Sequence, residues 1–145
     1  MLKKTITYVD YDGNQQTEDF YFNLTKAEIT KLFMSPKGGL DTMLRKMVRE
    51  TNTGKIVETI EQIILMSYGE KSFDGKRFIK EDPKTGRPLY KDFKESPAYS
   101  ALFMEIIEGG DAAATAFING VIPQTVAEQI SKERAIQAVS EPKLN

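Results

Sequence analysis

The sequence contains no histidine and no cysteine. These two side chains most often supply proton transfer near neutral pH, thiolate attack and ligands for transition metals. Reactions through serine, lysine, tyrosine or carboxylate groups remain open, but the chain has no nucleophile elbow, phosphate-binding loop or dinucleotide-binding glycine motif. We therefore expect a protein that is not an enzyme and that has no metal site and no cofactor.

A long apolar run is also missing. No stretch of about 18 apolar residues is present to span a bilayer, and the amino terminus alternates polar and apolar residues where a signal peptide has an apolar block. We expect a soluble cytoplasmic protein without membrane contacts. The net charge of -1 gives no global attraction to nucleic acid, and 145 residues suffice for one domain with its own core.

Two short segments near the amino terminus, at 5–9 and 17–22, are rich in β-branched and aromatic residues. Between them, residues 10–14 read Asp-Tyr-Asp-Gly-Asn, which is strong turn chemistry. This pattern predicts a β-hairpin over residues 4–22. A hairpin alone is marginal in water, so its apolar face must pack on the helices that follow or on another subunit.

Apolar residues recur at helical spacing through much of the remaining chain, and Thr25 with Glu28 forms a capping box that marks a helix start. The predicted helices cover residues 26–34, 40–52, 55–68, 97–108, 112–120 and 125–139, with a flexible tail at 140–145. The sequence therefore predicts an α+β fold, mainly α, in which the hairpin precedes about five to six helices. We expect residues 1–139 to form a single compact domain.

From residue 70 to residue 95 the helical pattern disappears and turn dipeptides follow one another, which predicts a long loop or a loose hairpin. Residues 71–94 hold eight Lys or Arg against four Asp or Glu, a net charge of +4 that leaves -5 for the rest of the chain. Long loops in compact domains are usually disordered or functional, so this basic loop is a candidate contact surface. Its candidate cations are Lys76, Arg77, Lys80 and Arg87.

Aromatic residues are interleaved with these cations, at Phe73, Phe78, Tyr90 and Phe93. Cations with stacking rings can hold single-stranded nucleic acid, so a small nucleic-acid-binding accessory protein is the alternative function. The acidic remainder of the chain opposes approach to phosphates, and a solvated loop with its rings tucked into the domain explains the pattern more simply. A third interpretation is that the loop reaches a neighbouring subunit, where Phe73 or Phe78 would be buried.

The order of elements and the carboxy-terminal half resemble a known family. A loop at 73–78 leads into Ser-Pro-Ala-Tyr at 96–99 and then into Phe-Ile-Asn-Gly-Val-Ile-Pro at 117–123. In these features, and over most of its length, the chain resembles the tail assembly chaperones of siphophages that infect Gram-positive bacteria. The resemblance implies a non-catalytic protein of virion assembly that acts in the host bacterial cytoplasm and is absent from the mature virion.

The same resemblance implies partners. The protein would coat and solubilise the tape measure protein, help to recruit the major tail protein, and associate with itself. In this family a longer form is commonly made by translational frameshifting. If this chain is the short form, the portion that contacts the tail-tube subunit would largely be missing, and only the DNA sequence can decide this.

Such a chaperone must shield apolar faces of another protein, so we expect an exposed apolar groove or an oligomer that presents one. The candidate interaction residues are Phe73, Phe78, Tyr99, Phe103, Phe117 and Ile118. Aromatic and aliphatic residues at helical spacing are, however, more often buried in a protein's own core. A hydrolase would need paired acids such as Glu105 and Glu108, for which a solvated helix face is the better interpretation.

Overall fold

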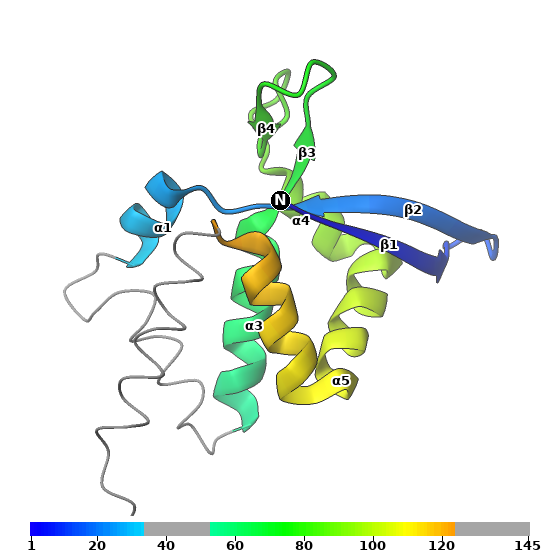
Figure 1. Ribbon diagram of the computed structural model, residues 1–145. Coiled ribbons are helices and arrows are strands. Elements are labelled where there is room, and N and C mark those ends of the chain that lie inside the picture. The colour runs from blue at the N-terminus through cyan, green and yellow to red at the C-terminus, as the bar shows by residue number, and fades with distance from the viewer. Residues whose placement is uncertain (34–52, 124–145) are drawn as a thin grey trace, which may run out of the picture.

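The computed structural model describes residues 1–33 and 53–123, which form an antiparallel sheet packed on helices (Figure 1). In chain order the elements are β1 (Leu2–Val9), β2 (Gln15–Phe22), α1 (Lys26–Phe33), α3 (Thr53–Ser67), β3 (Tyr68–Lys71), β4 (Phe78–Ile79), α4 (Leu89–Glu95) and α5 (Pro97–Val121). The helices predicted at 40–52 and 125–139 and the tail predicted at 140–145 lie outside the described residues.

The hairpin predicted at the amino terminus is confirmed as β1 and β2. The two strands pair antiparallel from Leu2 opposite Phe22 to Val9 opposite Gln15. The burial of β1 alternates as expected for a sheet with one covered face, with Ile6 buried between two exposed neighbours, whereas β2 is mostly exposed at its start and buried at Phe22. Figure 1 shows this hairpin extending well beyond the helices, so that its turn lies far from the body of the molecule.

The sheet continues with two strands: β3 begins two residues before the segment 70–95 that was predicted as a long loop or a loose hairpin, and β4 lies inside it. β3 pairs with β2 through Phe22 opposite Tyr68, and β4 pairs with β3 through Lys71 opposite Phe78. Gly69 makes this close packing possible, because a Cβ there would lie 2.6 Å from the Phe78 ring. The β3–β4 hairpin leaves the sheet in a different direction from β1–β2 (Figure 1).

The capping box at the start of α1 is also confirmed. The Glu28 amide donates to Thr25 Oγ1 at 3.1 Å, and Glu28 Oε1 accepts the Thr25 amide at 3.0 Å. These two bonds satisfy amide donors that a helix amino terminus otherwise leaves free.

Helix α5 covers the two helices predicted at 97–108 and 112–120, which the structure joins through a kink. Gly110 adopts φ 69° and ψ -155° there, a conformation that only glycine enters readily. Because of the kink the two arms of α5 fold back on each other, with α3 beside the second arm (Figure 1).

The core lies between the sheet and the helices and draws on all of them except the short β4. It consists of aliphatic residues from α3 and α5 and of a group of rings that pack on Phe93 of α4. Phe93 stacks on Tyr68 with ring centroids 4.2 Å apart and meets Phe22 edge-on at 5.7 Å. The fully buried side chains in this core include Phe22, Ile64, Leu102 and Val121.

The predicted fold class was wrong in two respects. The described residues hold a four-stranded sheet and four helices, where a two-stranded hairpin and five to six helices were expected. Strands β3 and β4 are too short to show alternation, since β3 reads Tyr-Gly-Glu-Lys and β4 has two residues. Helix α4 has seven residues and no side-chain cap, so the sequence carried little signal for it.

Candidate protein-interaction surface

The turn between β3 and β4 is held by side chains from within itself. Ser72, only 5% exposed, donates from Oγ to Asp74 Oδ1 at 2.7 Å and accepts the Arg77 amide at 2.9 Å. Asp74 Oδ1 also accepts the Lys76 amide at 3.0 Å, and Gly75 occupies the position with positive φ. These bonds fix the turn, and the hydrogen bonds from Lys76 and Ser72 lower the pKa of Asp74.

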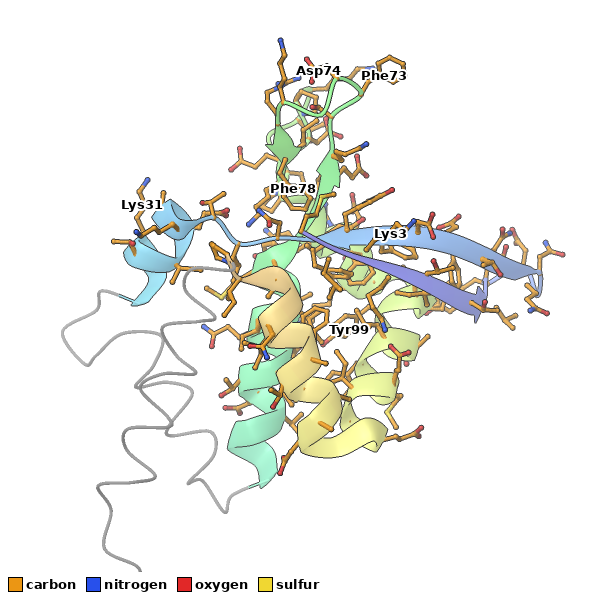
Figure 2. The ribbon with its side chains drawn as sticks, in the orientation of Figure 1. Lys3, Lys31, Phe73, Asp74, Phe78 and Tyr99 are labelled. Atoms are coloured by element: carbon orange, nitrogen blue, oxygen red, sulfur yellow. The ribbon has the colours of Figure 1, made fainter. Side chains whose placement is uncertain are left out.

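The residue that this fixed turn presents is Phe73. Its side chain is fully exposed, the most exposed large apolar side chain among the described residues. Figure 2 shows Phe73 and Asp74 at the outer end of the hairpin, away from the sheet and helices. Lys71, Lys76 and Arg77 are exposed around it. We name the segment 71–77 the basic turn.

The other ring predicted to make contacts in this hairpin, Phe78, points inward. It is partly buried and covers Gly69, and the Lys80 ammonium lies 5.8 Å from its ring centroid. Lys80 pairs with Glu28 of α1 and donates to the Met66 carbonyl at 3.0 Å. Phe78 therefore packs within the hairpin, and Lys80 attaches the hairpin to α1 and α3.

Arg87 follows a second turn and forms ion pairs with acidic residues of α4. Its Nε lies 3.0 Å from Asp92 Oδ1, and its Nη2 lies 3.5 Å from Glu95 Oε1. Of the four candidate cations, Lys76 and Arg77 thus lie in the basic turn, whereas Lys80 and Arg87 make contacts within the chain.

The four interaction candidates on α5 do not form one exposed groove. Phe117 and Ile118 are each 5% exposed, and the Phe117 ring meets Phe22 edge-on at 5.3 Å. Tyr99 and Phe103 are half-buried neighbours with ring centroids 5.9 Å apart. Figure 2 places Tyr99 beside the sheet, far from Phe73. An interaction role for Phe117 and Ile118 would require the core to open.

The rings that suggested nucleic-acid stacking are not presented together. Phe93 is 3% exposed in the core, and Phe78 packs on Gly69. Phe73 and Tyr90 are the two that keep substantial exposure. Sequence-tolerant binding of single strands uses successive exposed rings, so this arrangement does not favour it.

Sequence reasoning missed a second exposed ring on the turn between β1 and β2. Tyr11 is 86% exposed, between Asp10 and Asp12. Asp10 Oδ1 accepts the amides of Asp12 and Asn14, and its Oδ2 accepts Gln16 Nε2 at 2.8 Å. The bond from Gln16, with those from Asn14 and Asp12, lowers the pKa of Asp10. The sequence predicted a turn at residues 10–14, but it gave no signal that the Tyr11 side chain would be exposed to solvent.

The acids weighed for hydrolysis lie on the outer surface of α5. Glu105 pairs with Lys4 at 2.8 Å, and both Glu105 and Glu108 are exposed. Within residues 1–33 and 53–123 no group of three or more acidic residues is arranged to hold a metal ion. In the same part of the chain no helix is both long and apolar enough to cross a membrane.

Comparison with known proteins gives one family. A family model described as phage tail assembly chaperone matches residues 1–145, the whole chain. No curated protein and no solved structure matches the chain.

Proposed function

This chain belongs to the phage tail assembly chaperone family, and from that premise we propose that it is a non-catalytic chaperone which binds the tape measure protein during tail morphogenesis. Many copies coat this partner, keep it soluble in the host cytoplasm and help to recruit tail-tube subunits. The chaperone then leaves and is absent from the mature virion. The chain acts as the short member of a frameshifted pair, and the longer member supplies the contact with the major tail protein.

The observation that carries this proposal beyond the family match is the basic turn. A fully exposed phenylalanine on a turn fixed by five hydrogen bonds leaves its apolar surface in water and contributes nothing to the core. Presenting such a side chain without further ordering is typical of protein-contact residues. We propose that Phe73 makes a contact within the coat, and that the half-buried pair Tyr99 and Phe103 meets the tape measure protein.

The test is co-expression of the tagged chain with the tape measure protein of the same phage, followed by affinity capture and light scattering on a sizing column. We expect a soluble complex with many copies of this chain per partner. A tape measure protein that stays insoluble while this chain elutes alone would contradict the proposal.

Phe103→Ala is expected to lower the amount of captured partner, with Glu108→Ala on the same helix as the matched control. Circular dichroism of each purified variant separates lost binding from lost folding. Equal capture by the two folded variants would remove Phe103 from the contact. Nucleic acid in the capture that high salt removes would instead favour the alternative function of a nucleic-acid-binding accessory protein.

A further inference from the structure

The charges of the two projecting hairpins are opposite. Between Thr5 and Thr25 the chain has no Lys or Arg but four acids, Asp10, Asp12, Glu18 and Asp19. The basic turn has three cations and one acid, and the cations are exposed. We name residues 10–14, with the neighbouring Glu18 and Asp19, the acidic turn. A chain of net charge -1 therefore carries the acidic turn and the basic turn at the ends of separate hairpins, and we call these two ends the tips.

Each tip also presents one bare aromatic ring. Tyr11 is 86% exposed on the acidic turn, and Phe73 is fully exposed on the basic turn. Among the described residues these are the two most exposed large apolar side chains. Both turns are fixed from within by an aspartate that accepts backbone amides, Asp10 in one and Asp74 in the other. Neither turn needs to be ordered before it can bind, which lowers the cost of association.

The two tips cannot meet within one copy of the chain. Figure 1 shows the β1–β2 hairpin and the β3–β4 hairpin leaving the body in different directions, with their turns at the outer ends. Both hairpins are tied to the rest of the chain, the first through Ile6 and Phe22 in the core and the second through Tyr68 stacked on Phe93 and Lys80 paired with Glu28 of α1. The complementary surface for each tip must therefore come from another molecule.

We propose that the basic turn of one copy binds the acidic turn of a second copy. Phe73 packs against Tyr11 of the second copy, while Lys76 and Arg77 lie against its Asp12 and Glu18. Because each copy uses two different surfaces, the contact is heterologous, and repetition generates a ring or an open helical filament. This inference rests on the proposed coat and deepens it by naming the contact between copies.

A contact between two turns is much smaller than a standard interface of about 1,600 Å², so a single link is weak. We expect self-association of the purified chain to appear at protein concentrations of about 100 µM and to fall with dilution. It should also weaken as salt is raised from about 50 mM to about 500 mM, since the paired charges are exposed and screened.

Two double variants test the contact with the purified full chain and no partner. The first, Tyr11→Ser with Asp12→Ser, disables the acidic turn, and the second, Phe73→Ser with Lys76→Glu, disables the basic turn. None of these four side chains makes a hydrogen bond or ion pair that the described structure records, so both variants should fold. Each alone is expected to associate at least about tenfold more weakly than the unmodified chain in sedimentation velocity.

Mixing the two variants is the decisive arm. One intact basic turn then meets one intact acidic turn, so the mixture should form dimers and stop there, because the remaining ends are both disabled. The matched control is Met104→Ser with Lys91→Glu, which removes an exposed apolar side chain and reverses a charge away from both turns. It should associate as the unmodified chain does.

Three results would overturn the proposal: a chain that stays monomeric at every concentration, double variants that associate like the control, or a mixture that stays monomeric. None of them bears on capture of the tape measure protein, which is measured separately. If association fails and capture succeeds, the contact between copies is wrong and the chaperone function stands. If capture fails and association succeeds, the chaperone function is wrong and the contact between copies stands.

Discussion

At the scale of single residues, Gly69 and Tyr68 determine how the second hairpin joins the sheet. Gly69 lies under the Phe78 ring, and Tyr68 stacks on Phe93. Both belong to a strand of four residues that sequence patterns did not reveal. Both residues are closely packed, so single substitutions at them should change the free energy of unfolding measurably.

Gly69→Ala is expected to destabilise the protein by about 2 kcal/mol or more, since the added methyl must displace packed atoms. The new Cβ would lie 2.6 Å from Phe78 Cε2 and 2.7 Å from the Ile79 carbonyl oxygen, and a backbone atom cannot move aside cheaply. Urea unfolding measures the loss. Gly120→Ala is the control, because its nearest neighbours at 3.0–3.3 Å belong to the movable Leu2 side chain. Equal losses in the two variants would contradict the packing.

Burial raises the pKa of Tyr68 to about 12, and the charges of Glu70, Asp92 and Glu18 act in the same direction. A pKa raised in the folded state contributes stability that is present below the unfolded value near 10 and is lost as the pH rises toward 12. As the pH rises from about 10 to about 12, the free energy of unfolding should therefore fall less for Tyr68→Phe than for the unmodified chain. The difference is of order 1 kcal/mol, because solvent screens a partly exposed ring.

The measurement is urea unfolding of both proteins at several alkaline pH values, with the stability of each at neutral pH as its own reference. Parallel pH profiles for Tyr68→Phe and the unmodified chain would show that Tyr68 is not buried as described.

At the scale of elements, those marked by local signals were predictable, and those that depend on pairing with a distant strand were not. The hairpin at 4–22 and the start of α1 carried local signals, in the turn residues and in the capping box of Thr25 and Glu28, and both are confirmed. The kink at Gly110 follows from the Gly-Gly break that separated the predicted helices. Strand β3 depends on pairing with distant β2, which no local pattern can show, and the two-residue β4 pairs with β3.

The candidate site was less predictable than the fold. A sequence pattern gives the same stripe for a core helix and for a binding groove, so Phe117 and Phe73 looked alike as apolar contact residues. Exposure separates them, with Phe117 in the core and Phe73 fully outside it. Exposure depends on the tertiary fold. For Tyr11 the sequence predicted a turn, but it did not predict how exposed the side chain would be.

Helix α4 is anchored by one side chain, so Phe93→Ala should be severe. Phe93 is 3% exposed and packs on Tyr68, Phe20 and Phe22. Truncation should cost about 3–5 kcal/mol, the usual range for a buried phenylalanine. Tyr90→Ala in the same helix, 37% exposed, is the matched control and should cost much less. Thermal unfolding of both variants checks this, and similar midpoints would mean that α4 does not depend on Phe93.

At the scale of the whole molecule, one core joins the sheet to the helices. Ile6 from β1, Ile29 from α1, Ile64 from α3 and Phe117 from α5 belong to the same cluster of buried residues. This continuity supports the proposal that the chain folds as a single domain. A shared core couples the elements, so they should unfold together.

Unfolding is therefore expected to be one cooperative transition. Far-ultraviolet circular dichroism follows the backbone, and near-ultraviolet circular dichroism follows the packed tyrosines, including Tyr68 and Tyr99. The two signals should give the same midpoint and the same slope in urea. Separated midpoints would mean that the sheet and the helices are independent units.

The two exposed tips have a consequence for how such a protein changes over time. Neither Tyr11 nor Phe73 belongs to the core cluster, and each turn is fixed by its own aspartate. Mutations at the bare rings and the surrounding charges can therefore accumulate with little loss of folding stability. Two descendants of one chain that change both turns in a compensating way would each still recognise themselves while ceasing to recognise each other.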